Sequence, residues 1–122
     1  MENKIAIVDD NESILASIES ILKDNGYDVK CYNDPLGVVE KIREYLPSLI
    51  MLDIHMPGKN GIELLKEIKG DSVLKKIPVV MLTVEGSPSE IQLSMLYGAN
   101  TYILKPAKKD DILNVVKNIL IV

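Results

Sequence analysis

Five polar residues lie directly after short apolar runs of the chain and bring together three kinds of reactive group. These residues are Asp9, Asp10, Asp53, Thr83 and Lys105. The apolar runs that precede them are 5–8, 49–52, 79–82 and 102–104. If the runs are parallel strands, their carboxyl ends share one edge of a sheet, which is where open α/β sheets bind ligands. The sequence therefore predicts a site of three carboxylates, one hydroxyl and one amine.

The formal charges of these side chains predict a metal-dependent site that accepts a phosphoryl group. Three carboxylates within a few ångströms repel one another by about 4 kcal/mol per close pair at an effective dielectric of about 20, so the site needs protons or a cation. Oxygen ligands without a cysteine or histidine cluster suit Mg²⁺, or the similar Mn²⁺, better than zinc. With one such ion and the ammonium of Lys105 the resting site is neutral, and a phosphoryl group on Asp53 changes its charge only to about −1.

Each of the three reactive groups has a role in such chemistry. Asp53 can act as the nucleophile, since carboxylates form aspartyl phosphates. Lys105 can pair with one phosphoryl oxygen and the Thr83 hydroxyl can donate to another, while the metal holds a third. His55 is the only histidine of the chain, and a single such side chain does not by itself indicate a metal ligand.

Segments of helical period alternate with the apolar runs and predict the elements that position these residues. A further strand is expected over 29–32. The expected helices are 12–25, a second between an N-cap signal at 33–35 and a stop at 46–47, 62–70, a fourth from a capping box at 87–90 to Gly98, and 110–120. The resulting (βα)5 order predicts an α/β fold, a flavodoxin-like doubly wound three-layer sandwich around a parallel five-stranded sheet of order 2-1-3-4-5. In that order the first and third strands are neighbours, so Asp9 and Asp10 lie beside Asp53.

Length and composition favour a single domain over residues 1–122 and exclude several classes of protein. With 47% apolar residues, the chain can form one core. Its net charge is −4 and its 14 lysines and arginines are spread along the sequence, which argues against direct binding of nucleic acid. Cys31 is the only cysteine, which suits a reducing compartment. Because the apolar runs fall short of the ~20 residues of a membrane span, we expect a cytoplasmic protein that does not bind membranes.

With these motifs in this order, the chain resembles the receiver domain of the bacterial two-component response regulators. The similarity covers essentially all 122 residues and rests on the segments 8–10, 52–61, 82–83, 98–99 and 102–106. It implies a signalling domain, not a turnover enzyme, that takes a phosphoryl group on Asp53 from a histidine kinase or a phosphotransfer protein. It also implies a downstream protein target and either a monomer or a phosphorylation-dependent dimer.

The resemblance further implies a metal site. In it, the side chains of Asp9, Asp10 and Asp53 bind Mg²⁺ together with the backbone carbonyl of His55.

The resemblance also implies a switch built from Thr83, Lys105 and Tyr102. Thr83 is expected to move toward the phosphoryl group, which vacates space for Tyr102 to turn inward. That movement remodels the face made by the fourth helix, the fifth strand and the fifth helix. The peptide bond between Lys105 and Pro106 is expected to be cis.

Two other classes of protein that share parts of this arrangement are excluded by their chemistry. A phosphatase of the haloacid-dehalogenase type needs a second aspartate two residues after the first, where this chain has His55. A flavodoxin or dinucleotide-binding protein needs a phosphate-binding loop after the first strand, where Asp9 and Asp10 repel phosphate unless a metal intervenes. The alternative that stays open is a receiver-like interaction module that signals without phosphate.

Some residues near the predicted site depart from the usual pattern of the family. Val84 stands where a smaller residue is common, and its branched side chain is expected to hinder access to Asp53 and to slow phosphorylation by small donors. Glu85 places a negative charge near the site entrance.

Other departures concern the output of the domain. Asn100, Thr101 and Ala107 differ from the residues typical of the winged-helix DNA-binding subclass, and the chain is expected to be either a stand-alone receiver or part of a larger regulator. In the fourth helix, Leu93 and Leu96 fall off the face expected from residues 91 and 95. They form either a partner patch or a packing contact.

Overall fold

The computed structural model describes residues 3–84 and 88–120. Within these residues, the strands of the sheet are β1 (Lys4–Val8), β2 (Asp28–Tyr32), β3 (Leu49–Asp53), β4 (Val79–Val84) and β5 (Thr101–Lys105). The helices are α1 (Glu12–Asp24), α2 (Val38–Tyr45), α3 (Gly61–Lys69), α4 (Pro88–Leu96) and α5 (Lys109–Ile119). All strand pairs are parallel and the order is β2-β1-β3-β4-β5, which confirms the predicted flavodoxin-like topology.

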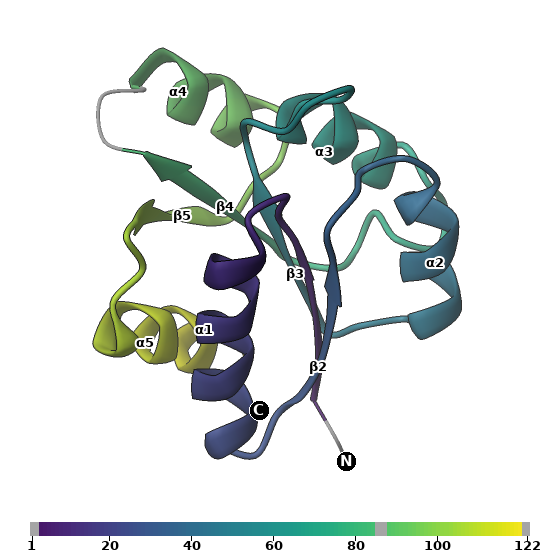
Figure 1. Ribbon diagram of the computed structural model, residues 1–122. Helices are drawn as coiled ribbons and strands as arrows, with labels where there is room; N and C mark the ends of the chain where they lie inside the picture. The colour runs from purple at the N-terminus through teal and green to yellow at the C-terminus, as the bar shows by residue number, and fades with distance from the viewer. Residues whose placement is uncertain (1–2, 85–87, 121–122) are drawn as a thin grey trace.

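Two layers of helices cover the sheet, α1 and α5 on one face and α2, α3 and α4 on the other (Figure 1). Successive strand residues point to opposite faces, so each central strand contributes to two cores. In β1, Ile5 and Ile7 pack with α1 and α5, whereas Ala6 and Val8 pack with α2 and α3. This burial on both faces explains why β3 and most of β4 are continuous apolar runs without alternation.

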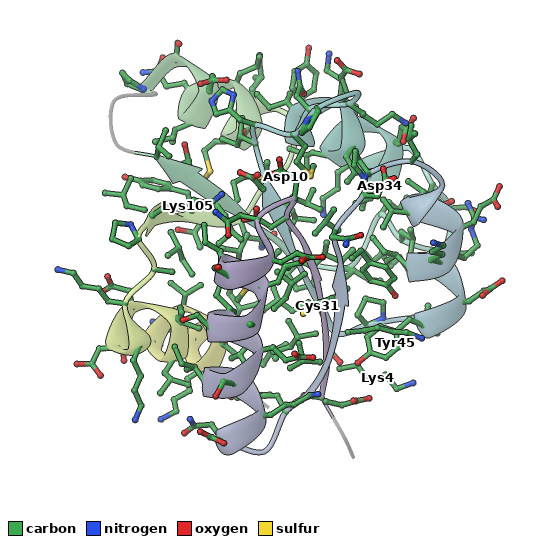
Figure 2. All side chains as sticks on the ribbon, viewed as in Figure 1. Lys4, Asp10, Cys31, Asp34, Tyr45 and Lys105 are labelled. Atoms are coloured by element: carbon green, nitrogen blue, oxygen red, sulfur yellow. The ribbon has the colours of Figure 1, made fainter. Side chains whose placement is uncertain are left out.

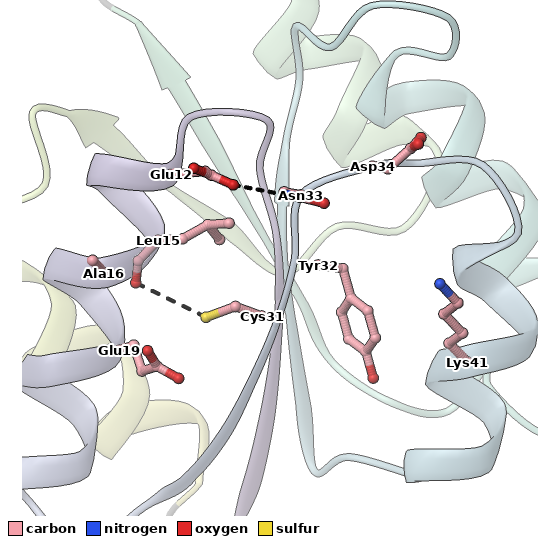
Figure 3. Close-up of a pocket in the computed structure, with 9 residues that line it drawn as sticks. All are labelled: Glu12, Leu15, Ala16, Glu19, Cys31, Tyr32, Asn33, Asp34 and Lys41. Carbon is pink, nitrogen blue, oxygen red and sulfur yellow. Dashed lines mark hydrogen bonds between the residues drawn. The ribbon is translucent and has the colours of Figure 1, made fainter.

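The edge strand β2 shows the same division. Cys31 points toward α1 and Tyr32 points toward α2 (Figure 3). The thiol of Cys31 lies 3.9 Å from the carbonyl oxygen of Leu15, and burial, followed by the charge of Glu19, raises its pKa to about 11. Cys31 therefore stays a protonated, packed side chain, which agrees with a structural role.

Helices α1 and α3 begin and end within one residue of the predicted bounds. The side chain of Asn11 accepts a hydrogen bond from the backbone N–H of Ile14, and Asn60 caps α3 in the same way. Gly70 is the C-cap of α3.

The prediction for the start of α2 is wrong. The Asp34 side chain accepts a hydrogen bond from the N–H of Leu36 at 2.9 Å, which forms a local turn instead of a helix cap. Gly37 then adopts the left-handed conformation (φ 69°), and the helix begins only at Val38. Pro35 thus precedes the helix and does not lie in its first turn.

Helix α4 also differs from expectation. Its only buried residue is Ser94, whereas Met95, expected on the packed face, is 43% exposed. Leu93 and Leu96 are exposed, as their position off that face predicts. The capping box proposed for this helix starts at Ser87, which lies outside the described residues. No helix in the described part of the chain is long and apolar enough to cross a membrane.

Candidate functional site

The five polar residues of the sequence prediction gather at the carboxyl edge of the sheet. Asp53 and Lys105 end β3 and β5, Thr83 is the penultimate residue of β4, and Asp9 and Asp10 directly follow β1. The registers of the parallel pairs place Val8 beside Leu52 and Asp53 beside Leu82, so the strand ends are level. Figure 2 shows Asp10 and Lys105 at this same edge.

Lys105 forms the centre of the site by bridging two buried carboxylates. Its Nζ lies 2.8 Å from Oδ2 of Asp9 and 2.8 Å from Oδ1 of Asp53. Asp9 is fully buried and Asp53 is 3% exposed. The remaining oxygen of Asp9 accepts a hydrogen bond from the N–H of Asn11 at 2.9 Å. An ammonium held between two buried carboxylates fixes both of them and leaves one negative charge of the pair unbalanced.

The pKa values of Asp53 and Lys105 are both shifted, because burial and the placement of one ammonium between two carboxylates both act on them. Burial raises the pKa of Asp53 to about 6, the bond from Lys105 opposes this, and the charge of Asp9 adds to it. Burial alone would lower the pKa of Lys105, but the hydrogen bonds that its ammonium donates to Asp53 and Asp9 reverse this and raise its pKa. The ammonium is therefore firmly protonated, while Asp53 holds a proton more tightly than an ordinary aspartate.

A third carboxylate completes an acidic cluster that fits a hard cation. One oxygen each from Asp9, Asp10 and Asp53 lie within 4.8 Å of one another, and Asp10 is exposed. Carboxylate oxygens from two buried residues and one accessible residue, open to water on one side, are the ligands that Mg²⁺ prefers. The donor set, together with the raised pKa of Asp53, thus suits a divalent ion, and a cation bound here would offset the excess negative charge.

Thr83 and Tyr102 form no hydrogen bond with the carboxylates of the acidic cluster. Thr83 is 1% exposed, and its hydroxyl donates to the carbonyl oxygen of Val84 at 3.3 Å instead of to Asp53. Tyr102 is 41% exposed on β5. The peptide bond between Lys105 and Pro106 is cis.

A cavity of about 770 Å³ leads to the carboxyl edge of the sheet. Its lining combines the site residues with the first turns of α1 and the loop after β5; it comprises Asp10, Asn11, Ser13, Ile14, Ser17, Asp53, His55, Val84, Lys105, Pro106 and Ala107. Val84 is 48% exposed and therefore lies at the entrance, as the sequence predicts. Glu85, the other residue predicted there, lies outside the described residues.

Two features of the site were missed by the sequence analysis. A Cβ added to Gly61 would lie 2.0 Å from the backbone oxygen of Asp53, so only glycine allows α3 to start directly behind β3. His55, which follows Asp53 by two residues, has its Nε2 3.0 Å from Oε1 of Glu90 in α4. The Asn60–Gly61 pair before a periodic segment signals the first of these features, whereas no local signal joins residues 55 and 90.

Comparisons with known proteins agree with this geometry. Residues 5–117 match the family model described as the response regulator receiver domain. The DNA-binding response regulator MtrA of Mycolicibacterium paratuberculosis is 32% identical over 112 residues, which are 92% of this chain and 48% of MtrA. The chain thus spans about half the length of this relative.

Solved structures show the same fold. The chemotaxis response regulator CheY4 of Vibrio cholerae superposes with a TM-score of 0.92 at 30% identity, covering 98% of this chain and 100% of that one. The receiver domain of NtrX from Brucella abortus has a TM-score of 0.88 at 31% identity, covering 95% of this chain and 97% of that one.

Proposed function

This chain belongs to the response regulator receiver domain family, which acts in two-component phosphorelay signalling, and on that premise we propose that Asp53 is its phosphoacceptor. The observation that carries the proposal is the pair of 2.8 Å contacts by which Lys105 holds the buried carboxylates of Asp9 and Asp53. An ammonium already placed on the acceptor oxygen can pair with the phosphoryl oxygens as charge develops there. Residues 1–122 form one receiver domain in this proposal.

The proposed step is the transfer of a phosphoryl group from a phosphohistidine of a kinase or phosphotransfer protein. A carboxylate oxygen of Asp53 attacks phosphorus, the phosphorus–nitrogen bond breaks, and the imidazole leaves as the acyl phosphate forms. Asp9, Asp10 and Asp53, with the backbone carbonyl of His55, would hold Mg²⁺ or Mn²⁺, which supplies charge stabilisation for the transferred group. Lys105 pairs with a second phosphoryl oxygen. The domain assists this single event and is not a turnover enzyme.

The proposed switch starts at Thr83, whose hydroxyl donates to the neighbouring carbonyl of Val84. A phosphoryl group on Asp53 offers this hydroxyl a charged acceptor, and Tyr102, exposed on β5, then turns toward the space that Thr83 vacates. Charge-assisted hydrogen bonds of about 1.5–3 kcal/mol each can together supply the ~5.5 kcal/mol that moves an equilibrium from 1:99 to 99:1. The face of α4, β5 and α5 is the proposed output.

The output partner in this proposal is a protein. The face of α4, β5 and α5 exposes Leu96, Tyr102 and Leu104, which is the chemistry of a protein contact and not of a nucleic-acid contact. Direct DNA binding is therefore not proposed for these residues, and the domain is a monomer or a dimer that forms on phosphorylation. A kinase donor and a single cysteine both favour a cytoplasmic location.

Incubation with Mg²⁺ and acetyl phosphate, followed by intact mass, tests the proposal directly. A mass increase of one phosphoryl group in the wild type, lost in Asp53→Asn, is the expected result. Beryllofluoride with Mg²⁺ should shift the amide NMR signals of Thr83, Tyr102 and α4. Absence of both responses would favour the rival function, an interaction module that signals without phosphate.

A further inference from the structure

A second polar cluster lies away from the phosphoacceptor edge, between the edge strand β2 and helix α2. A cavity of about 270 Å³ opens there, which we call the β2–α2 pocket; it is lined by Lys4, Lys30, Tyr32, Lys41, Glu44 and Tyr45. The lining residues include three lysines and one glutamate, which gives the lining a formal charge of +2 in a chain whose net charge is −4. This concentration of positive charge has no part in the proposed phosphorelay function.

The fold brings these residues together by simple periodicity. In the β1–β2 pair, Lys4 lies opposite Asp28 and Ala6 opposite Lys30, so Lys4, Lys30 and Tyr32 point to the face covered by α2. On α2, residues 41, 44 and 45 are one helical turn apart and share a face. Tyr45 lies beside Lys4 in Figure 2, and the ring of Tyr32 and the side chain of Lys41 both lie between β2 and α2 in Figure 3.

The ammonium groups of two strand lysines are gathered around one aromatic ring. Nζ of Lys4 and Nζ of Lys30 each lie 5.5 Å from the centroid of the Tyr45 ring, within the range of a cation–π contact. Lys4 also donates to the backbone carbonyl of Tyr45 at 3.4 Å, which orients it at the end of α2. In the part of the chain that the structure describes, Lys4, Lys30 and Lys41 form no ion pair with a carboxylate.

A neutral donor accompanies these charges. The hydroxyl oxygen of Tyr32 is buried and has no hydrogen-bond partner among the described residues. Burial raises the pKa of this hydroxyl and the charge of Glu44 raises it further, so the group stays protonated at neutral pH and can donate. A buried hydroxyl without a partner is unfavourable, and a bound acceptor would relieve this cost.

We propose that the β2–α2 pocket binds a phosphate group carried by a small molecule. Lysine ammonium groups bind phosphate as point charges, the pocket charge of +2 matches a phosphate dianion, and the Tyr32 hydroxyl supplies a further donor. The small volume between a strand and a helix favours a small ligand over a macromolecule. This site is independent of Asp53 and needs no covalent step.

Titration of the full chain with inorganic phosphate, and separately with glycerol phosphate, tests the proposal and distinguishes a free phosphate from a phosphate ester. The titrations use metal-free buffer and constant ionic strength set with chloride, so that the acidic edge of the sheet does not attract the anion. Saturable shifts of the amide NMR signals of Lys30, Tyr32 and Tyr45 are expected. Because each lost contact is a charge-assisted or buried hydrogen bond, Lys30→Gln and Tyr32→Phe should each weaken binding about tenfold.

Lys117→Gln is the matched control, because Lys117 is an exposed lysine on α5, away from the pocket. It should bind phosphate as tightly as the wild type. Shifts that grow without saturation, or that are equal in Lys30→Gln and Lys117→Gln, would show general ionic screening and overturn the proposal.

A second measurement separates binding from folding. Tyr32→Phe removes an unpaired buried hydroxyl, so its melting temperature in chloride should equal or exceed that of the wild type. Phosphate should then raise the melting temperature of the wild type more than that of this variant, because the variant binds it more weakly. Both pocket variants should keep the response to Mg²⁺ and beryllofluoride at Asp53, so a loss of phosphate binding in the pocket would not count against Asp53 as the phosphoacceptor. If phosphate stabilises Tyr32→Phe as much as the wild type, the proposed phosphate site in the pocket is refuted.

Discussion

Helices α3 and α4 have the same length but are attached to the domain in opposite ways. Each has nine residues and each follows a strand that ends at the carboxyl edge of the sheet, where the acidic cluster lies. Helix α3 buries five residues, namely Gly61, Ile62, Leu64, Leu65 and Ile68. Helix α4 buries only Ser94 and exposes Leu93, Met95 and Leu96. Apolar burial therefore fixes the first helix and contributes little to fixing the second.

Two polar contacts near its ends join α4 to the rest of the domain. Near its start, Glu90 contacts His55, and just after its end, the ammonium of Lys66 lies 4.3 Å from the centroid of the Tyr97 ring. Contacts of this kind contribute about 1 kcal/mol or less when exposed. The helix that follows Asp53 in the chain, α3, is thus held by apolar packing. The helix that follows Thr83, α4, can move with a small loss of free energy, because few of its residues are buried. This difference suits the proposed function, in which Asp53 stays fixed and the face of α4, β5 and α5 moves.

The largest test of this comparison truncates one leucine in each helix. Leu65→Ala should lower the free energy of unfolding by about 2–5 kcal/mol, because Leu65 is fully buried. Leu96→Ala should change it by less than about 0.5 kcal/mol, because Leu96 is 78% exposed. Urea unfolding of both variants measures the two values. Similar losses would show that α4 is packed as firmly as α3.

The next largest effect is the pH dependence of stability caused by Asp53, which ends β3 and precedes the well-packed helix α3. Because the pKa of Asp53 is raised to about 6, the folded state binds more protons than the unfolded state between pH ~4 and ~6. Stability of the metal-free domain should therefore fall as the pH rises through that window. Asp53→Asn has no carboxylate to deprotonate, so its stability should not fall in this window. It should be about 3 kcal/mol more stable than the wild type above pH ~6, with little difference below pH ~4.

Urea unfolding in the presence of a chelator, from acidic to neutral pH, checks this dependence. Added Mg²⁺ should stabilise the wild type and not Asp53→Asn, because the ion offsets the negative charge. A variant that is less stable than the wild type at neutral pH would contradict the expected sign.

A smaller effect is expected at the entrance of the site, where β4 leads toward α4. Val84→Ala should raise the rate of phosphorylation of Asp53 by acetyl phosphate roughly two- to tenfold, about 1 kcal/mol in the barrier, because Val84 lines the cavity that reaches Asp53. Val73→Ala is the matched control, since Val73 is an equally exposed valine far from this cavity. Equal rates in the wild type and Val84→Ala would remove steric hindrance as an explanation.

The smallest effect concerns the contact between His55 and Glu90. Glu90→Ala should speed amide hydrogen exchange in α4 about two- to fivefold, because an exposed pair contributes at most about 1 kcal/mol. Glu67→Ala breaks the exposed 2.7 Å pair with Lys59, which joins α3 to its own preceding loop, and should leave exchange in α4 unchanged. If both variants act alike, the contact between His55 and Glu90 does not restrain α4.

The two helices also show which structural features the sequence could predict. The period of Ile62, Leu65 and Ile68 predicts α3 correctly, because a helix that packs on a core needs an apolar stripe. The face assigned to α4 from Ile91 and Met95 is wrong at Met95, which is exposed, whereas Ile91 is half-buried. A helix whose only buried residue is a serine carries no continuous apolar stripe. The start of α2 is misplaced for another reason, since the Asp34 side chain caps a turn and Gly37 delays the helix.

The order of strands and helices, the family and the set of reactive residues could all be predicted from the amino-acid sequence, since each depends on local periodicity and on motifs within a few positions. Three features became visible only in the folded domain: one ammonium lies 2.8 Å from both Asp9 and Asp53, Gly61 packs against the backbone of Asp53, and lysines of β1, β2 and α2 line one pocket. These are contacts between segments distant in the chain. Their distances depend on strand register and helix packing, which residue spacing alone does not specify.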